Sequence, residues 1–347
     1  MDNFVNNLTK ENKNILLLVD DRGQFYSSTK EPGASMNVSL IVEKFKEFDY
    51  AVMVKGFSEL DFAEESCRDF FVLYQSTEDP DLRYKDYVED VLLGLKISGS
   101  ILVPKFEYFR AHHNKVFMEI LRGKMNYGAH IKTSHFGTIE ELKKSKHEFS
   151  YPLVIKPSAG SRSSSVMLAH NKKQLFKLAS RVSRSLSLTN IERAIKSVII
   201  ARSYKNISNH RRKFIVQEFI VGLSGDYKVL VYGDRYYVVR RENRPGDFRA
   251  SGSGRVSFPE VVSSELLNYA QNIFKNSNTP FMGMDIADSG GQYYLIEFQF
   301  VTMGNYALEK SSFYFKKVSN KWQRIEEVSQ LEYVFVESVI KYLNTNY

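Results

Sequence analysis

The acids Asp285 and Glu297 and the amide Gln299 lie in two apolar runs near residues 281–300. Asp285 belongs to FMGMDIAD, Glu297 and Gln299 belong to QYYLIEFQF, and a Ser-Gly-Gly turn separates the runs. This pattern predicts a β-hairpin that places Asp285 beside Glu297, with Gln299 on the same face as Glu297. Two carboxylates and an amide oxygen suit Mg²⁺, and burying both acids without a cation would be costly. The alternative is that each acid faces solvent at a strand end.

A lysine followed by small residues is the second feature. Lys156 closes the apolar run YPLVIKP, and the loop SAGSRSSS, which contains Ser161 and Ser163, leads into a return strand VMLA. Small side chains let backbone N–H groups approach phosphate oxygens, and the lysine adds positive charge. The loop lacks the GK[ST] signature of a Walker A motif. A Ser-rich hairpin loop without a ligand is the alternative.

A short connector after another apolar strand is the third feature. The run RKFIVQEFI ends in Gln217, Glu218, Phe219 and Ile220, and Asp226 opens the next run, DYKVLVYG. Backbone groups of such a connector can pair with the edge of an adenine ring, and the later acid can accept hydrogen bonds from ribose hydroxyls. An acid at a strand start is also common without any ligand.

An arginine-rich loop is the fourth feature. The segment RRENRPGDFRASGSGRV combines glycine and serine with five arginines: Arg240, Arg241, Arg244, Arg249 and Arg255. Phosphoryl transfer requires cations around the developing negative charge, on a segment that can open and close. The alternative is an ordinary surface loop.

The order of these features resembles the ATP-grasp superfamily, above all the RimK-type carboxylate–amine ligases and the relatives of glutathione synthetase. The resemblance covers about residues 100–310. It implies an ATP-grasp fold, with ATP and Mg²⁺ as cofactors and Mn²⁺ as an alternative cation. It also implies a ligase that forms a C–N bond through an acylphosphate and releases ADP and phosphate. The substrates would be small carboxylates and amines, and an acidic sugar or polysaccharide precursor is one hypothesis.

The resemblance also implies roles for individual residues. The phosphate-binding residues would be Lys115, Lys156, Ser161 and Ser163. The other nucleotide contacts would be Gln217, Glu218, Phe219, Ile220, Asp226, Lys228, Arg249, Ala250 and Ser251. Arg249 and Arg255 would act at the transferring phosphate, and Asp285, Glu297 and Gln299 would bind Mg²⁺. Gln299 stands where asparagine is usual, Lys228 where arginine is usual, and FVTMGN replaces the usual Ser-Pro-Gly.

Three folded units are expected to position these residues. Residues 1–105 predict an α/β domain, 106–212 a central lid subdomain with a basic helical insertion, and 213–347 an antiparallel α+β subdomain with the metal site. The predicted buried strands of the first domain are 14–20, 51–54 and 70–74. Helices are expected over 38–47, 84–97, 112–124, 172–204, 262–275 and 325–345.

Composition narrows the class of protein. The 347 residues carry a net charge of +8 and one cysteine, Cys67, which excludes an internal disulfide. No apolar run approaches the ~20 residues of a membrane helix, and a cytoplasmic location is expected. Residues 172–213 hold twelve cations and one acid, Glu192, and this pattern is typical either of an anion-binding surface or of a solvated helical face. Few aromatic residues interrupt these charges, which disfavours nucleic acid. An ATP-grasp kinase, a non-catalytic nucleotide-binding module and a homodimer remain alternatives.

Overall fold

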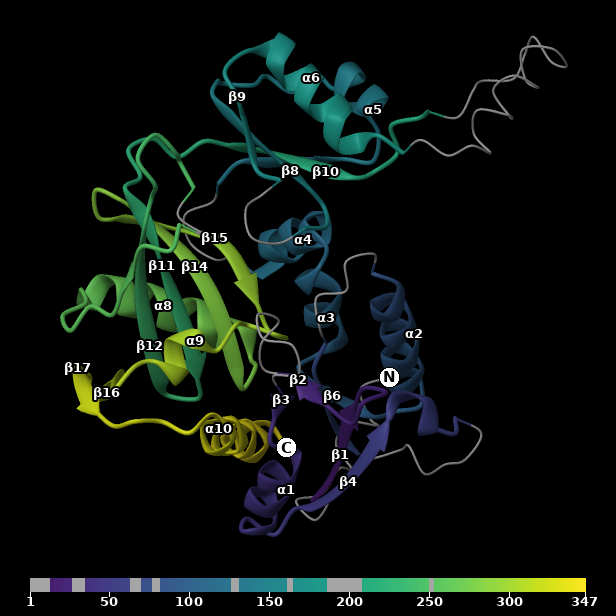
Figure 1. The fold of residues 1–347 in the computed structure, drawn as a ribbon, viewed down its shortest axis with the longest axis vertical. Coiled ribbons are helices and arrows are strands. Elements are labelled where there is room, and N and C mark those ends of the chain that lie inside the picture. Colours follow the sequence, from purple (N-terminus) through teal and green to yellow (C-terminus); the bar gives the residue numbers. More distant parts are fainter. Residues whose placement is uncertain are drawn as a thin grey trace, which may run out of the picture. The chain divides into compact units, whose positions relative to one another are not determined.

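The computed structural model describes residues 13–26, 35–62, 70–76, 82–125, 131–160, 165–185, 208–249 and 253–347. It divides the chain into two compact units. We call residues 1–112, 125–129 and 223–347 the terminal unit, and residues 113–124 and 130–222 the central unit. Figure 1 shows the elements of both. No helix among the described residues is long and apolar enough to cross a membrane.

A parallel sheet forms the N-terminal part of the terminal unit. Its strands, in the spatial order β4-β1-β5-β6, are β4 (Ala51–Gly56), β1 (Asn14–Val19), β5 (Phe71–Tyr74) and β6 (Ile101–Val103). The nearby short elements and helices are β2 (Phe25–Tyr26), β3 (Ser35–Met36), α1 (Val38–Lys46), η2 (Phe57–Glu59), α2 (Arg83–Ile97) and α3 (Phe106–His112). The predicted α/β character of this part is therefore confirmed.

One prediction about this sheet was wrong. The run at 51–54 forms a strand as expected, but it is not buried, because Met53 and Val54 are 44% and 41% exposed. Strand β4 lies at the edge of the sheet, and its one partner among the described strands is β1. An apolar run of this length does not reveal whether a strand is central or at an edge.

Local signals explain where the helices begin. Asn37 caps α1, since its side chain accepts a hydrogen bond from the backbone N–H of Leu40. Ser263 caps α8 (Ser264–Ser277) in the same way through Leu266. In place of the single helix expected over 112–124, the structure has two, because α3 ends at residue 112 and α4 (Lys115–Met125) begins after Asn114. Asn114 caps α4, since its Oδ1 accepts a hydrogen bond from the N–H of Phe117.

An antiparallel sheet forms the C-terminal part of the terminal unit. Its main strands, in spatial order, are β15 (Gln292–Gln299), β14 (Phe281–Ser289), β11 (Gly225–Tyr232), β12 (Arg235–Glu242), β16 (Phe313–Val318) and β17 (Lys321–Glu326). The short strand β13 (Val256–Ser257) pairs with β12, and α9 (Tyr306–Glu309) and α10 (Leu331–Asn346) complete this part. The predicted helix over 325–345 starts later, at Leu331, because residues 325 and 326 belong to β17.

A shared core joins the two parts of the terminal unit. The largest cluster of buried side chains includes Leu17 of β1, Tyr237 of β12 and Phe335 of α10. The ring of Phe335 lies 5.6 Å from that of Phe25, measured between centroids. Helix α10 therefore docks against the N-terminal sheet, which explains why both chain ends belong to one unit.

The central unit is built on a second antiparallel sheet. Its strands, in the order β7-β10-β8-β9, are β7 (Thr133–Phe136), β10 (Phe214–Glu218), β8 (Leu153–Pro157) and β9 (Met167–Ala169). Helices α5 (Ile139–Lys144) and α6 (Lys172–Ser183) pack on one face, where Leu142 and Leu175 join Ile155 and Val216 in the core. The figure shows both helices on the same side of β8 and β10. Only residues 172–183 of the helix predicted over 172–204 are seen as α6, and residues 186–207 lie outside the described part.

Candidate functional site

The predicted carboxylate pair is brought together in the terminal unit. Asp285 of β14 lies directly opposite Glu297 of β15, and Gly283 lies opposite Gln299. The register shifts just after Asp285, which places a bulge on β15 beside the pair. Asp285, Glu297 and Gln299 therefore share one face of the sheet, as the hairpin pattern predicted.

Two cations from the neighbouring strands reach the same place. The Arg241 guanidinium on β12 donates from Nη2 to Oδ2 of Asp285 at 2.8 Å. The ammonium nitrogen of Lys228, on β11, lies 4.0 Å from the other oxygen of Asp285. Lys228 lies directly opposite Asp285 on the neighbouring strand, so its side chain lies on the same face of the sheet as Asp285, Glu297 and Gln299. Lys228 was predicted from sequence, whereas Arg241 had been noted only as one arginine among five.

Arg241 also holds a second acid. Its Nε and Nη2 donate to the two carboxylate oxygens of Asp226 at 2.6 and 2.8 Å. Asp226 is only 6% exposed, and burial raises the pKa of its carboxyl, an effect that Arg241 partly offsets. Burial would lower the pKa of Arg241, but Asp285 and Asp226 together raise it above its usual value. The predicted contact of Asp226 with ribose stays a prediction.

The donor set of this face fits a divalent cation. The three acids Asp226, Asp285 and Glu297 face the two cations Lys228 and Arg241, so these side chains carry one net negative charge when all are ionised. Burial lowers the pKa of Lys228, and the nearby carboxylate of Asp285 opposes this effect. Carboxylate and amide oxygens are the ligands that Mg²⁺ takes. The residues present therefore fit a magnesium ion, and its binding at this face stays a prediction.

The arginine-rich loop is described in part. Arg249 donates from Nε and Nη2 to the carboxylate of Asp247, at 2.9 and 2.8 Å. Arg255 donates from Nη2 to Glu242 at 2.8 Å. Ala250 and Ser251 lie outside the described residues. The predicted roles of this loop at a nucleotide stay predictions.

A buried lysine marks the second group of predicted residues, in the central unit. Lys156 on β8 is 7% exposed and donates from Nζ to Oε1 of Gln217 on β10 at 2.8 Å. The amide nitrogen of Gln217 in turn donates to Oγ1 of Thr133 on β7 at 3.0 Å. These three side chains lie on the sheet face opposite to α5 and α6. Thr133 was not predicted, because nothing in its local sequence signals a partner 84 residues away.

The helix lysine meets the small-residue loop. Lys115 at the start of α4 donates from its backbone N–H to Ser158 and from Nζ to the carbonyl oxygen of Gly160, at 2.9 and 2.8 Å. Ser158 also donates to Oδ1 of Asn114 at 2.9 Å. Lys115 therefore lies where the loop begins, and its predicted contact with phosphate stays a prediction. Ser161 and Ser163 lie outside the described residues.

The predicted hinge follows β10. The N–H of Glu218 donates to the carbonyl of Lys132 at 3.0 Å, and Phe219 and Ile220 continue the chain, partly exposed. A small pocket beside Glu218 is lined by residues that include Lys132 and Phe149. This pocket also contacts Val216, on the helix-covered side of the sheet. It is therefore separate from the side chains of Lys156 and Gln217.

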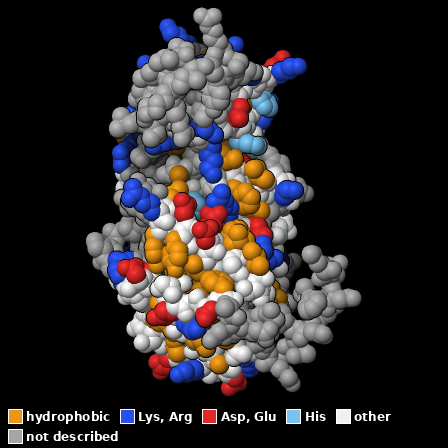
Figure 2. Space-filling model, turned by 90° about the vertical axis from the view of Figure 1, so that its right-hand side faces the viewer, with side chains coloured by type: hydrophobic (Ala, Val, Ile, Leu, Met, Phe, Trp, Pro, Cys, Tyr) orange, Lys and Arg blue, Asp and Glu red, His pale blue; other side chains and the backbone are white. Residues whose placement is uncertain are grey.

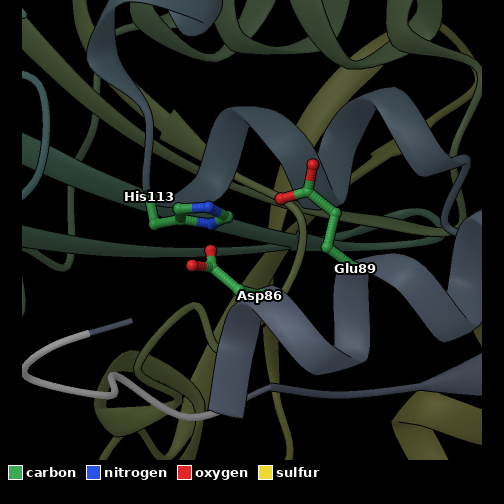
Figure 3. Close-up of side chains that lie close together, drawn as sticks. All are labelled: Asp86, Glu89 and His113. Atoms are coloured by element: carbon green, nitrogen blue, oxygen red, sulfur yellow. The ribbon is translucent and has the colours of Figure 1, made fainter. Parts of the chain in front are cut away.

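A further acidic pair stands on α2. Asp86 and Glu89 lie one turn apart on that helix (Figure 3). Glu89 accepts from Nη1 of Arg110 on α3 at 2.6 Å. The charge of Glu89 is therefore balanced by Arg110.

The comparison with known families decides the class of this protein. The model of the RimK-like ATP-grasp domain matches residues 129–314, more than half of the chain. The chain belongs to the RimK-like ATP-grasp family. The expected ATP-grasp fold is thereby confirmed, and ATP and Mg²⁺ are the cofactors of this family of ligases. No curated protein sequence matches the chain.

Several solved structures align with most of this RimK-like chain. D-cycloserine synthetase DcsG aligns over 95% of this chain and 99% of its own, with a TM-score of 0.56 and 11% identity. A RimK domain ATP-grasp protein from Sphaerobacter thermophilus aligns over 94% of this chain and 99% of its own, with a TM-score of 0.47 and 14% identity. D-alanine–D-alanine ligase from Bacillus anthracis aligns over 96% and 98%, with a TM-score of 0.46 and 13% identity. At 11% identity, the likeness to D-cycloserine synthetase is one of fold.

Proposed function

We propose that this protein is an ATP-dependent carboxylate–amine ligase that works through an acylphosphate. The observation that carries the proposal is the face formed by Asp285, Glu297 and Gln299, with Lys228 and Arg241 beside it. An oxygen-donor set next to two cations suits the metal and the phosphates of a nucleotide at once. Membership of a ligase family supports the same assignment.

The residues divide into those that hold the metal and those that hold the nucleotide. Asp285, Glu297 and Gln299 are assigned to Mg²⁺, and Mn²⁺ suits the same oxygen ligands. Bound there, the cation would neutralise phosphate charge and polarise the γ-phosphate. Lys115 and Lys156 are assigned to phosphate oxygens, and the backbone after β10 to the adenine edge. Arg249 and Arg255 are assigned to the transferring phosphate.

The proposed reaction has two steps. An oxygen of the substrate carboxylate attacks the γ-phosphorus of ATP, the bond to the β,γ-bridging oxygen breaks, and ADP leaves. The nitrogen of the amine then attacks the acyl carbon of the acylphosphate, phosphate leaves with the electron pair of the broken C–O bond, and the nitrogen loses a proton. The protein contributes positioning and charge stabilisation, so it needs no covalent participant.

Products distinguish this reaction from its alternatives. The experiment incubates the protein with Mg²⁺ and ATP, pooled carboxylates and pooled amines, and resolves ADP, AMP and free phosphate. A ligase of the proposed kind yields ADP and phosphate only when both pools are present. ADP without free phosphate would indicate an ATP-grasp kinase, and AMP would indicate an adenylate instead of an acylphosphate. Either result, or no turnover with any pool, would contradict the proposal.

A further inference from the structure

The central unit separates its predicted ATP-binding side chains from most of its surface charge. Lys156 and Gln217 lie on the same face of the sheet, on the neighbouring strands β8 and β10, and a hydrogen bond joins them. Helices α5 and α6 cover the other face and bury Leu142 and Leu175 against it. Charges on the outer sides of these helices therefore cannot be assigned to the nucleotide.

Those outer sides are strongly basic. Six exposed cations define what we call the outer basic face: Lys143, Lys144, Lys172, Lys173, Lys177 and Arg181. Among the described residues, none of the six forms an ion pair with an acid. The nearby Glu141 turns back to accept from the N–H groups of Gly137 and Thr138. Figure 2 shows lysine and arginine among the described side chains on one face of the molecule.

Three of the cations form a regular stripe. Lys173, Lys177 and Arg181 follow one another at intervals of four residues on the 12-residue helix α6, so successive charges lie about 6 Å apart along one side. Like charges at this spacing repel each other and weaken the helix slightly. A line of evenly spaced cations matches an anion that repeats its charge at the same interval. In an extended polypeptide, every second side chain points the same way, about 6.5 Å apart.

Other polyanions fit this surface less well. The exposed large hydrophobic side chains of the described residues include none on α5 or α6, so the face offers nothing to insert into a lipid layer. It also offers no exposed aromatic ring on which nucleic acid bases could stack.

We propose that the outer basic face docks an extended acidic segment of a polypeptide. Alternate carboxylates of that segment would pair with Lys173, Lys177 and Arg181, and the remaining three cations would add long-range attraction. A polypeptide rich in aspartate and glutamate also carries the carboxylates that a ligase of this kind activates. That last link rests on the proposed function, whereas the docking itself does not.

The test measures binding without ATP, so it is independent of the ligase reaction. Fluorescence anisotropy measures the binding of the native protein to three fluorescein-labelled probes: an oligoglutamate, an oligouronate and an RNA oligonucleotide. Flotation measures its binding to anionic lipid vesicles. The key variant is Lys173→Glu, Lys177→Glu and Arg181→Glu combined. The matched control reverses three exposed lysines of the terminal unit: Lys46→Glu, Lys275→Glu and Lys321→Glu. Circular dichroism of both variants checks that they fold.

The proposal predicts that oligoglutamate binds best and that its affinity falls as salt rises. The α6 variant should bind it about tenfold more weakly, if each exposed pair contributes a factor of two to three. In the control variant, the affinity for oligoglutamate should fall by less than half as much as in the α6 variant. Equal or tighter binding of RNA, uronate or vesicles would overturn the choice of partner. No binding of oligoglutamate, or equal losses in both triple variants, would overturn the docking surface.

Discussion

Arg241 binds Asp285, the residue that is assigned to magnesium, with its Nη2 2.8 Å from Oδ2 of the carboxylate. The same guanidinium makes two hydrogen bonds to Asp226. One partly buried arginine thus bridges two acids from two different strands. A metal bound at Asp285 would compete with this ion pair, so the site must rearrange its charges when it is loaded.

The first prediction concerns this arginine. Arg241→Ala removes the cation from the buried Asp226 and the partly buried Asp285, and we expect the free energy of unfolding to fall by about 3 kcal/mol. Thermal unfolding measures the loss, with Arg240→Ala as the control, because Arg240 lies on the same strand and donates to the exposed Ser224. Mg²⁺ should raise the melting temperature of Arg241→Ala more than that of the native protein. A variant as stable as the control would contradict the role of Arg241.

The second prediction concerns the metal ligands. Asp285→Asn and Glu297→Gln should each abolish ATP turnover and weaken the binding of Mn²⁺, while the fold persists. Electron paramagnetic resonance measures the Mn²⁺ binding. Removing one anionic oxygen ligand costs the site much of its attraction for a divalent cation. Glu265→Gln on α8 is the matched control, since Glu265 is exposed. Full activity in either site variant would remove these residues from the metal site.

The third prediction concerns the buried lysine of the central unit. Lys156→Met keeps the length of the side chain but loses its charge, and we expect affinity for a fluorescent ATP analogue to fall by roughly tenfold to a hundredfold. That range corresponds to the loss of a hydrogen bond from a charged donor. Lys275→Met, at an exposed position on α8, should leave the affinity unchanged. If both variants lost affinity equally, Lys156 would have no specific role.

The fourth prediction concerns pH and the docking of α10. Asp234 pairs with Lys341 of α10 and with Lys316 of β16, each at 3.0 Å. Burial alone would raise the pKa of Asp234, but these two partners outweigh it and leave the pKa lowered. The stabilisation is therefore present above the unfolded pKa of about 3.9 and is lost as pH falls through the lowered folded value.

Asp234→Asn should accordingly lower the free energy of unfolding at neutral pH. The side chain is 42% exposed, so screening limits the loss to about 1 kcal/mol. Chemical denaturation at a series of pH values checks the shape of the curve. The gap between native and variant protein should close in acid. A gap that widened in acid would mean that the pKa of Asp234 is raised instead.

Local sequence patterns predicted the hairpin at the centre of the site. The turn at Gly290 and Gly291 and the alternating runs around it were sufficient to place Asp285 opposite Glu297. Such a pairing depends on neighbours in the chain and on a turn that glycine permits. The predicted roles of these residues depend on the family, and the mutations above test them.

Other features depend on contacts that no local pattern contains. The Gln217–Thr133 hydrogen bond and the Arg241–Asp285 ion pair follow from which strands become neighbours. The hairpin of β16 and β17 turns at Ser319 and Asn320, both with positive φ. Its sequence was not read as strands, because lysines interrupt the alternation of apolar residues that marks a strand.

The most direct test of the proposed function follows an oxygen atom. The carboxylate pool is exchanged with ¹⁸O and incubated with the protein, Mg²⁺, ATP and the amine pool, and mass spectrometry analyses the released phosphate. Attack of the carboxylate on the γ-phosphate predicts phosphate that carries one ¹⁸O atom per molecule of amide formed. Unlabelled phosphate, or label that appears in AMP, would contradict the acylphosphate mechanism.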